Sequence, residues 1–265
     1  MQRDSSFYII LFSAILCVVC AVMVSSTAVG LKDLQEANEA LDEQRNVLEA
    51  AGLIEPGDKP TAEEVDEMLA NAEVVLVDVQ TGEETEVPGI DPKTYDPLAA
   101  KNDPELSYVA PKNNANIDRV AKYARVYKVN NEAGELQKLV LPVEGYGLWG
   151  TLYGFLALES DMNTVAGLTF YKHKETPGLG GEVDNPRWKS RWPGRKIYGP
   201  DGIEDVEIEV IKGAAGPVES EPYEVDGLSG ATITGRGITN MLDFWLGSRG
   251  FGSYIETFRQ QRSAA

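Results

Sequence analysis

The sequence predicts an α+β protein in which a single N-terminal transmembrane helix precedes an antiparallel sheet packed by helices. Three observations support this fold class. The segment from Phe7 to Val29 carries no charged residue. Several strand-like runs separated by turn residues follow from Ala124 onward. A clear helical pattern from Ile238 to Leu246 lies near the end of the chain. Strand runs followed by helices are typical of α+β folds.

The composition excludes several classes of function. The 265 residues include 42 acidic and 24 basic side chains, which gives a formal net charge of −18. This acidity argues against nucleic acid and anionic lipid headgroups as partners, because both need clustered cations. Both cysteines, Cys17 and Cys20, lie in the apolar segment, and His173 is the single histidine. The rest of the chain therefore has no disulfide and no Cys/His zinc cluster.

The uncharged segment from Phe7 to Val29 is long enough to cross a membrane. As a helix it would span about 34 Å, and the hydrocarbon core of a bilayer is about 30 Å thick. A cleaved signal peptide is the alternative, since Arg3 precedes the run and Ser26-Thr27-Ala28 resembles a cleavage site. The run is longer than a usual signal-peptide core, which favours an anchor. Arg3 before the span favours an inside N-terminus and an outside main domain.

The predicted span contains small side chains and no charged ones. The small residues are Ser13, Ala14, Cys17, Cys20 and Ala21. Small residues let membrane helices approach closely, so this anchor can pack against partner helices. We interpret the two cysteines, which lie one helical turn apart, as buried thiols rather than metal ligands. Since no charged group lies in the span, this chain alone cannot line an ion path.

A stalk helix is predicted after the span. Leu34, Leu41 and Leu48 recur at heptad spacing between Leu31 and Ala51, and Gly52 is a stop signal. The leucine stripe is equally consistent with two arrangements. The helix could pack on its own domain, or it could face a partner protein.

An irregular acidic connection is predicted between the stalk and the main sheet. Thr61 to Glu64 forms a capping box that opens a short helix. Residues 81–116 are rich in Pro, Asp, Glu and Asn, so we expect little regular structure there.

Strands and two closing helices are predicted for the rest of the chain. The expected strands are 73–79, 124–129, 136–143, 148–158, 164–171 and a half-exposed strand at 206–210. Apolar residues at Ile238, Met241, Leu242, Trp245 and Leu246 predict an amphipathic helix that Gly247 ends. A last short helix is expected at 253–262. The predicted divisions are therefore an anchor (1–30), a stalk with the acidic connection (31–118) and a third domain (119–265).

A glycine-rich segment from Gly145 to Gly150 matches the dinucleotide pattern G-x-G-x-x-G. That pattern needs a helix directly after it, whose N-terminus holds a pyrophosphate. Here the next residues, Thr151 to Leu156, are aromatic and strand-like. We therefore predict no Rossmann site and no direct binding of NADH.

The segment from Asp226 to Thr232 is predicted to be a turn of small residues before a helix. Thr232 and Thr234 are both plausible caps of that helix. A helix N-terminus attracts phosphate through its free N–H groups and its dipole. Gly230 and Ala231 leave room for a bulky group, and a threonine can carry a phosphate as an ester. A plain helix cap is the alternative interpretation.

Two further segments complete the candidate site. In His173 to Gly180, Pro177 sets a tight turn whose glycines let a flat ring approach Leu179. We interpret His173 mainly as a structural hydrogen-bonding residue. Trp149, between the glycines of the first segment, suits either ring stacking or core packing.

Together these three segments resemble the FMN-binding domain family whose flavin is attached to threonine through a phosphoester. Asp226 to Thr232 resembles its flavinylation motif, with Thr232 as the acceptor. The single span, the helix from Gln35 to Arg45 and the ending from Asn240 to Gly247 resemble the C-subunit family of sodium-translocating NADH:quinone oxidoreductases. The acidic stretch 81–116 and Gly235, where a small hydroxyl residue is commoner, depart from the family pattern.

The resemblance implies a function. FMN bonded covalently to Thr232 would relay single electrons from NADH toward quinone within a bacterial inner-membrane complex of six subunits. A flavin transferase would make the bond on the periplasmic side, and sodium would cross other subunits. The expected ring contacts are Leu148, Trp149, Thr176, Leu179 and Gly180. The expected phosphate-end residues are Ser229, Gly230 and Ala231. Thr232 is then an attachment site, so no residue of this chain is expected to be a catalyst.

Three alternatives remain open on the sequence alone. The flavin subunit of the related Rnf electron-transport complex shares the flavinylation motif. A non-redox, membrane-anchored binding domain would use Thr232 as a plain cap. A secreted enzyme would lose its N-terminus and begin near Val29.

Overall fold

The computed structural model describes residues 6–131 and 133–263. The chain forms two compact units, Met1–Glu43 and Gln44–Ala265. The first unit contains α1 (Ser6–Gly30) and the beginning of α2 (Lys32–Ala50). Within the described residues, α1 is the one helix long and apolar enough to cross a membrane, by length and composition. None of its side chains is buried, and Cys17 and Cys20 are free thiols. The predicted N-terminal apolar helix is therefore confirmed.

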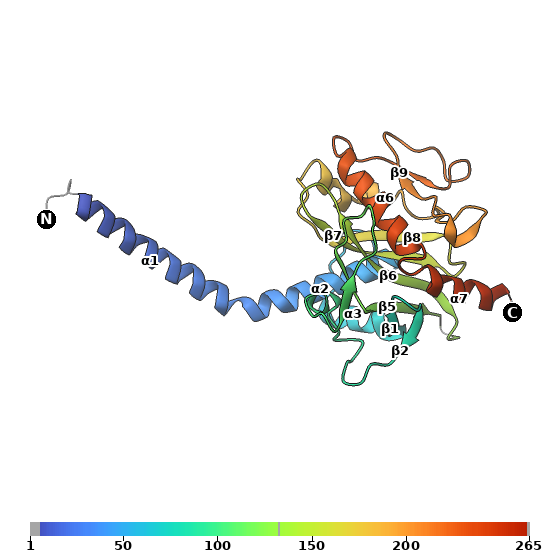
Figure 1. Cartoon of the computed structure of the whole chain (residues 1–265), viewed down its shortest axis with the longest axis horizontal. Helices are drawn as coiled ribbons and strands as arrows, with labels where there is room; N and C mark the ends of the chain where they lie inside the picture. The colour runs from blue at the N-terminus through green and yellow to red at the C-terminus, as the bar shows by residue number, and fades with distance from the viewer. Residues whose placement is uncertain (1–5, 132, 264–265) are drawn as a thin grey trace. The chain divides into compact units, whose positions relative to one another are not determined.

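The second unit is built on a six-stranded, fully antiparallel sheet with strand order β2-β1-β5-β6-β7-β8 (Figure 1). Its strands are β1 (Ala72–Asp78), β2 (Glu83–Thr85), β5 (Tyr123–Asn130), β6 (Leu136–Tyr146), β7 (Thr151–Glu159) and β8 (Val165–Lys172). This sheet confirms the predicted fold class. It also shows that β1 and β2 share one sheet with the strands that follow residue 119.

Helix α6 (Thr232–Leu246) covers one face of the sheet, where it lies across β6 (Figure 1). The predicted apolar stripe of α6 is buried in the largest core cluster. Trp245 also donates a hydrogen bond from Nε1 to the Glu144 carbonyl, at 2.8 Å. The opposite face packs on the end of α2, where Val47 and Ala50 meet Phe155 of β7. Two cores therefore hold β6 and β7 from both sides.

Shorter elements complete the second unit. The helices are α3 (Ala62–Met68), α4 (Pro97–Ala100), α5 (Pro186–Lys189) and α7 (Gly252–Ser263). The 3₁₀ turns are η1 (Leu69–Asn71), η2 (Gly180–Asp184) and η3 (Gly202–Glu204). Two small pairs are β3 (Ser107–Val109) with β4 (Arg119–Ala121), and β9 (Glu209–Val210) with β10 (Glu224–Val225). The Thr61–Glu64 capping box of α3 is present as predicted.

Three predictions need correction. The strand expected from Leu148 starts at Thr151, because Gly147 N–H bonds the Gly150 carbonyl and closes a turn first. The strand expected at 206–210 is reduced to β9, because the N–H groups of Glu207 and Ile208 both reach the Ile197 carbonyl and interrupt the ladder. β9 pairs in parallel with β10, so this small sheet is not antiparallel. The connection 81–116 also contains β2, α4 and β3, although most of it is irregular as expected.

Candidate functional site

The first predicted segment forms the hairpin turn between β6 and β7. The Gly147 N–H donates to the Gly150 carbonyl at 2.8 Å, which leaves Leu148 and Trp149 at the tip. Their side chains are 41% and 63% exposed. Trp149 is thus a surface residue and not a core residue. A strand, and not a helix, follows the turn, which agrees with the rejection of a Rossmann motif.

The second segment follows β8 and turns at Gly178, whose φ is +76°. The N–H groups of Leu179 and Gly181 donate to the Thr176 carbonyl at 3.1 and 2.9 Å. Leu179 is exposed and presses on the third segment: a Cβ on Gly230 would lie 2.9 Å from its Cδ2. Because Gly230 also has a φ of +71°, a side chain there would be strained as well as crowded.

The third segment leads into α6, where the two threonines have different environments. The N-cap is Ala231, which makes no side-chain cap, so the prediction that Thr232 or Thr234 caps the helix is wrong. Thr232 is the first helical residue; its side chain is exposed and makes no hydrogen bond within the described residues. Thr234 is fully buried and donates its hydroxyl to Oε2 of Glu175 at 2.6 Å. Only the Thr232 hydroxyl is therefore open to modification.

The first turn of α6 also presents free backbone donors. Among the described residues, the N–H groups of Thr232, Ile233 and Thr234 find no acceptor, whereas the Gly235 N–H bonds the Ala231 carbonyl. Free N–H groups at a helix N-terminus favour an anion. The exposed Thr232 hydroxyl thus lies beside free backbone donors that suit a phosphate.

Glu175 joins the three segments, and sequence reasoning did not single it out. Its side chain is 5% exposed. Oε1 accepts hydrogen bonds from the backbone N–H groups of Leu148 and Trp149, both at 2.9 Å, and Oε2 accepts the Thr234 hydroxyl. The donors come from positions far from Glu175 in the sequence, so no local pattern indicates them.

Missing side chains at three glycines allow this convergence. A Cβ on Gly147 would lie 2.6 Å from Oε1 of Glu175, and one on Gly180 would collide with Oε2. A Cβ on Gly237 would collide with the carbonyl of Tyr146, where α6 crosses β6. Because glycine has no side chain, these positions allow the hairpin, the Glu175 turn and α6 to contact one another.

His173 stabilises the turn that contains Glu175. Its Nδ1 accepts the Glu175 N–H at 3.1 Å, and its Nε2 lies 2.8 Å from Oδ2 of Asp184. In the neutral ring the proton is therefore on Nε2. The hydrogen bond with Asp184 raises the pKa of His173 above its ordinary value, and burial opposes this shift. These contacts agree with the structural role that we expected.

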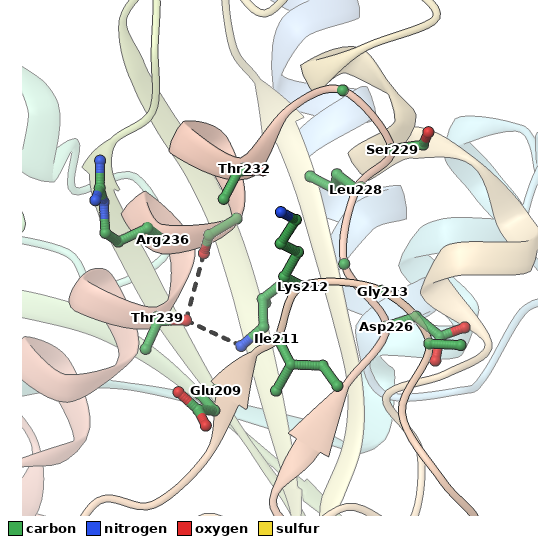
Figure 2. A pocket seen from close by; sticks show the side chains of 15 residues that line it. Glu209, Ile211, Lys212, Gly213, Asp226, Leu228, Ser229, Thr232, Arg236 and Thr239 are labelled. Atoms are coloured by element: carbon green, nitrogen blue, oxygen red, sulfur yellow. Dashed lines mark hydrogen bonds between the residues drawn. The ribbon is translucent and has the colours of Figure 1, made fainter.

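A groove of about 780 Å³ opens beside Thr232 (Figure 2). It is bounded by α6 and by the loop between β9 and β10, and Ser229, Gly230 and Thr232 form part of its wall. Lys212 and Arg236 also line it; both are exposed, and neither forms an ion pair within the described part of the chain. In Figure 2 the Lys212 side chain extends toward the end of the groove where Thr232 lies.

The groove is fixed by a hydrogen-bonded threonine on α6. The Thr239 hydroxyl accepts the Val210 N–H at 2.9 Å and donates to the Gly235 carbonyl at 3.3 Å (Figure 2). This contact ties β9 to α6, the two elements that border the groove. Sequence reasoning missed Lys212 and Arg236, because the groove that both line forms only when the β9–β10 loop folds back onto α6.

The predicted site residues fall into three groups: those that line the groove, those that are exposed on the loops, and those that are buried. Ser229 and Gly230 line the groove. Leu148, Trp149, Thr176 and Leu179 are exposed on the hairpin and the Gly178 turn, together with Ile233, which sequence reasoning missed. Gly180 and Ala231 are buried instead, Gly180 against Glu175 and Ala231 in the core.

Comparisons with known proteins agree with this architecture. A family model described as FMN-binding domain matches residues 147–247. The C subunit of the Na⁺-translocating NADH-quinone reductase of Pseudomonas aeruginosa is 45% identical over 263 residues, which cover 98% of each chain. The corresponding protein from Vibrio alginolyticus is 44% identical over 92% of this chain and 91% of its own.

Solved structures give the same result. The crystal structure of Shewanella oneidensis NqrC superposes with a TM-score of 0.75 at 33% identity, covering 84% of this chain and 99% of that one. The C subunit of the Na⁺-translocating NADH-quinone reductase from Parabacteroides distasonis gives a TM-score of 0.63 at 26% identity over 85% and 96% of the two chains.

Fold and site thus define an FMN-binding domain that follows an N-terminal apolar helix able to span a membrane. The degree of identity over almost the whole chain narrows this class further. The chain belongs to the family of C subunits of Na⁺-translocating NADH-quinone reductases. The resemblance stated from the sequence is confirmed.

Proposed function

We propose that this chain is a one-electron carrier of a Na⁺-translocating NADH:quinone oxidoreductase and holds FMN through a phosphoester on Thr232. FMN, when bound, supplies the redox chemistry, and the residues of this chain attach and orient it. One observation carries the proposal: of the two threonines in the first turn of α6, only Thr232 has an exposed, uncommitted hydroxyl.

The phosphate end of the ligand has suitable partners. The free N–H groups of the first turn of α6 and the positive end of its dipole favour a phosphodiester at Thr232. Lys212 and Arg236 line the adjoining groove without acidic partners among the described residues, in a protein of net charge −18. Two free cations beside this threonine offset the remaining phosphate charge.

The ring end of the ligand also has suitable partners. Leu148, Trp149, Leu179 and Ile233 are large apolar side chains, 41% to 63% exposed, on the segments that meet at the start of α6. Exposed apolar patches of this kind mark ligand sites. A flavin ring could cover Leu148, Trp149 and Leu179, with Thr176 and Gly180 shaping the turn beneath it.

The proposal includes the surroundings of the chain. Residues 1–30 would anchor it in the bacterial inner membrane, residues 31–118 would form the stalk and acidic connection, and residues 119–265 would be the FMN domain on the periplasmic side. Its partners would be a flavin transferase and the other members of a complex of six subunits. Sodium would cross those subunits, because α1 has no charged side chain.

Three variants test the attachment site. Each full-length chain is co-produced with a flavin transferase, denatured, and examined for flavin fluorescence on a gel. We expect Thr232→Ala to carry no flavin, Thr232→Ser to keep it, and Thr234→Val to keep it because the buried hydroxyl is not the acceptor. Flavin that remains on denatured Thr232→Ala would show that another residue is the acceptor.

A further inference from the structure

We propose that Glu175 is the positioning residue of the flavin site: it holds the two loops that face the ring and lowers the reduction potential of FMN through its fixed negative charge. This inference rests on the proposed function. Glu175 is not expected to touch the flavin. It would act through Leu148 and Trp149, whose backbone it binds, and through its charge.

The contacts of Glu175 use both carboxylate oxygens. Oε1 holds the hairpin tip through two N–H groups at 2.9 Å, and Oε2 holds α6 through the Thr234 hydroxyl at 2.6 Å. Its own N–H is bound by His173. One buried side chain therefore fixes the hairpin, the Gly178 turn and the helix that carries Thr232.

The arrangement suits the ionised carboxylate. Three donors and no acceptor face its two oxygens, and a carboxylate accepts while a protonated acid must also donate. Within the described residues Glu175 forms no ion pair, and the direct partners of its carboxylate are these three hydrogen-bond donors. Hydrogen bonds to an ionised group are stronger than neutral ones, which favours a rigid cradle.

A buried negative charge beside a redox group affects its reduction. Reduction adds negative charge, and a like charge in a poorly screened environment opposes it. Glu175 is 5% exposed, so solvent screens it little. Removing the charge without changing the side-chain volume should therefore raise the reduction potential.

Glu175→Gln tests the effect of the charge in the full-length chain loaded with flavin. The glutamine carbonyl can still accept the two N–H bonds, so we expect a folded, flavinylated protein. Its midpoint potential in a redox titration should be higher than that of the wild type. Glu182→Gln is the matched control: it removes the same charge from the neighbouring η2 turn, where Glu182 bonds Asn185 and not the loops. An unchanged or lower potential in Glu175→Gln, or an equal rise in Glu182→Gln, would overturn the electrostatic role.

Glu175→Ala tests the positioning role in the chain produced without the transferase. Loss of the carboxylate should speed hydrogen exchange at the Leu148 and Trp149 amides at least tenfold, while amides in the middle of β6 and β7 stay protected. Glu182→Ala, which removes a neighbouring carboxylate that bonds Asn185 and not the hairpin, should leave these two amides unchanged. Unchanged exchange in Glu175→Ala would overturn the positioning role. The exchange measurement needs no flavin. Its result therefore tests the positioning role of Glu175 even if FMN is not attached to Thr232.

Discussion

Two threonines at the start of α6 differ in whether their hydroxyl groups are accessible to solvent. Thr232 and Thr234 are two residues apart and have the same chemistry, but one hydroxyl faces solvent and the other is buried on Glu175. From the sequence both are plausible caps. The difference arises because Ala231 takes the cap position, which turns the side chain of Thr234 inward.

The only histidine gives a prediction about pH. The hydrogen bond with Asp184 raises the pKa of His173, with Glu175 adding to the shift and burial and Lys189 opposing it. Since the folded value lies above the unfolded value of about 6.5, the stability from this pair is full below that pH. It is lost as the pH rises through the folded value.

A single imidazole signal in an NMR titration measures this directly. Asp184→Asn should lower the pKa of His173, and urea unfolding should show that the extra stability at acid pH disappears. We expect that gain to be under about 1 kcal/mol, because Asp184 is half exposed. A pKa of His173 that does not change in Asp184→Asn would contradict the assigned cause.

At the scale of elements, the most buried ion pair between the acidic connection and the sheet joins Lys101 to Glu144. Lys101, at the end of α4, pairs with Glu144 of β6, whose side chain is 8% exposed. Lys101→Met leaves a buried carboxylate without its cation and should cost about 3–5 kcal/mol in the free energy of unfolding. Urea denaturation measures it.

Two controls accompany that variant. Lys196→Met breaks a surface pair with Asp161 and should cost less than about 1 kcal/mol. Adding Glu144→Gln to Lys101→Met should recover part of the loss, because the unpaired charge is gone. Equal losses for Lys101→Met and Lys196→Met would show that the buried pair does not hold the connection.

Two glycines in α6 should differ in how much stability the protein loses when each is replaced by alanine. A Cβ on Gly237 would collide with the Tyr146 carbonyl of β6, so Gly237→Ala should push α6 outward and cost about 1–3 kcal/mol. A Cβ on Gly235 would meet only the Val210 side chain at 3.1 Å. There the helix preference for alanine, about 0.5–1 kcal/mol, should offset the crowding. Thermal unfolding of both variants tests the contrast, and a stabilised Gly237→Ala would contradict the close packing of α6 on β6.

Long periodic elements could be predicted from the sequence, whereas contacts between elements could not. The stripe from Ile238 to Leu246 and the alternating strands specify α6 and the central sheet because one face of each must be buried. The start of β7 depends on the turn closed by the Gly147 N–H and the Gly150 carbonyl, and the length of β9 depends on hydrogen bonds to the carbonyl of Ile197, ten residues before Glu207. Glu175 lies 59 positions from Thr234, so its role is set by tertiary packing alone.

At the scale of the whole molecule, the prediction to test is the side of the membrane on which the second unit lies. The proposal places the second unit, which begins at Gln44, in the periplasm. An exposed position such as Ser220 can carry a new cysteine, after Cys17 and Cys20 are replaced by serine. A membrane-impermeant maleimide should label Ser220→Cys in intact cells. Labelling only after lysis would place the unit in the cytoplasm, and recovery of the chain outside the membrane fraction would contradict the anchor.

The central claim is that Thr232 carries FMN as a phosphoester. The most direct test is the intact mass of the full-length chain, co-produced with a flavin transferase, purified in detergent and denatured, followed by peptide mapping. The account predicts a mass increase equal to FMN minus one water, located on the peptide that contains Thr232. An unmodified chain, with the transferase shown to be active on a control substrate, would contradict it.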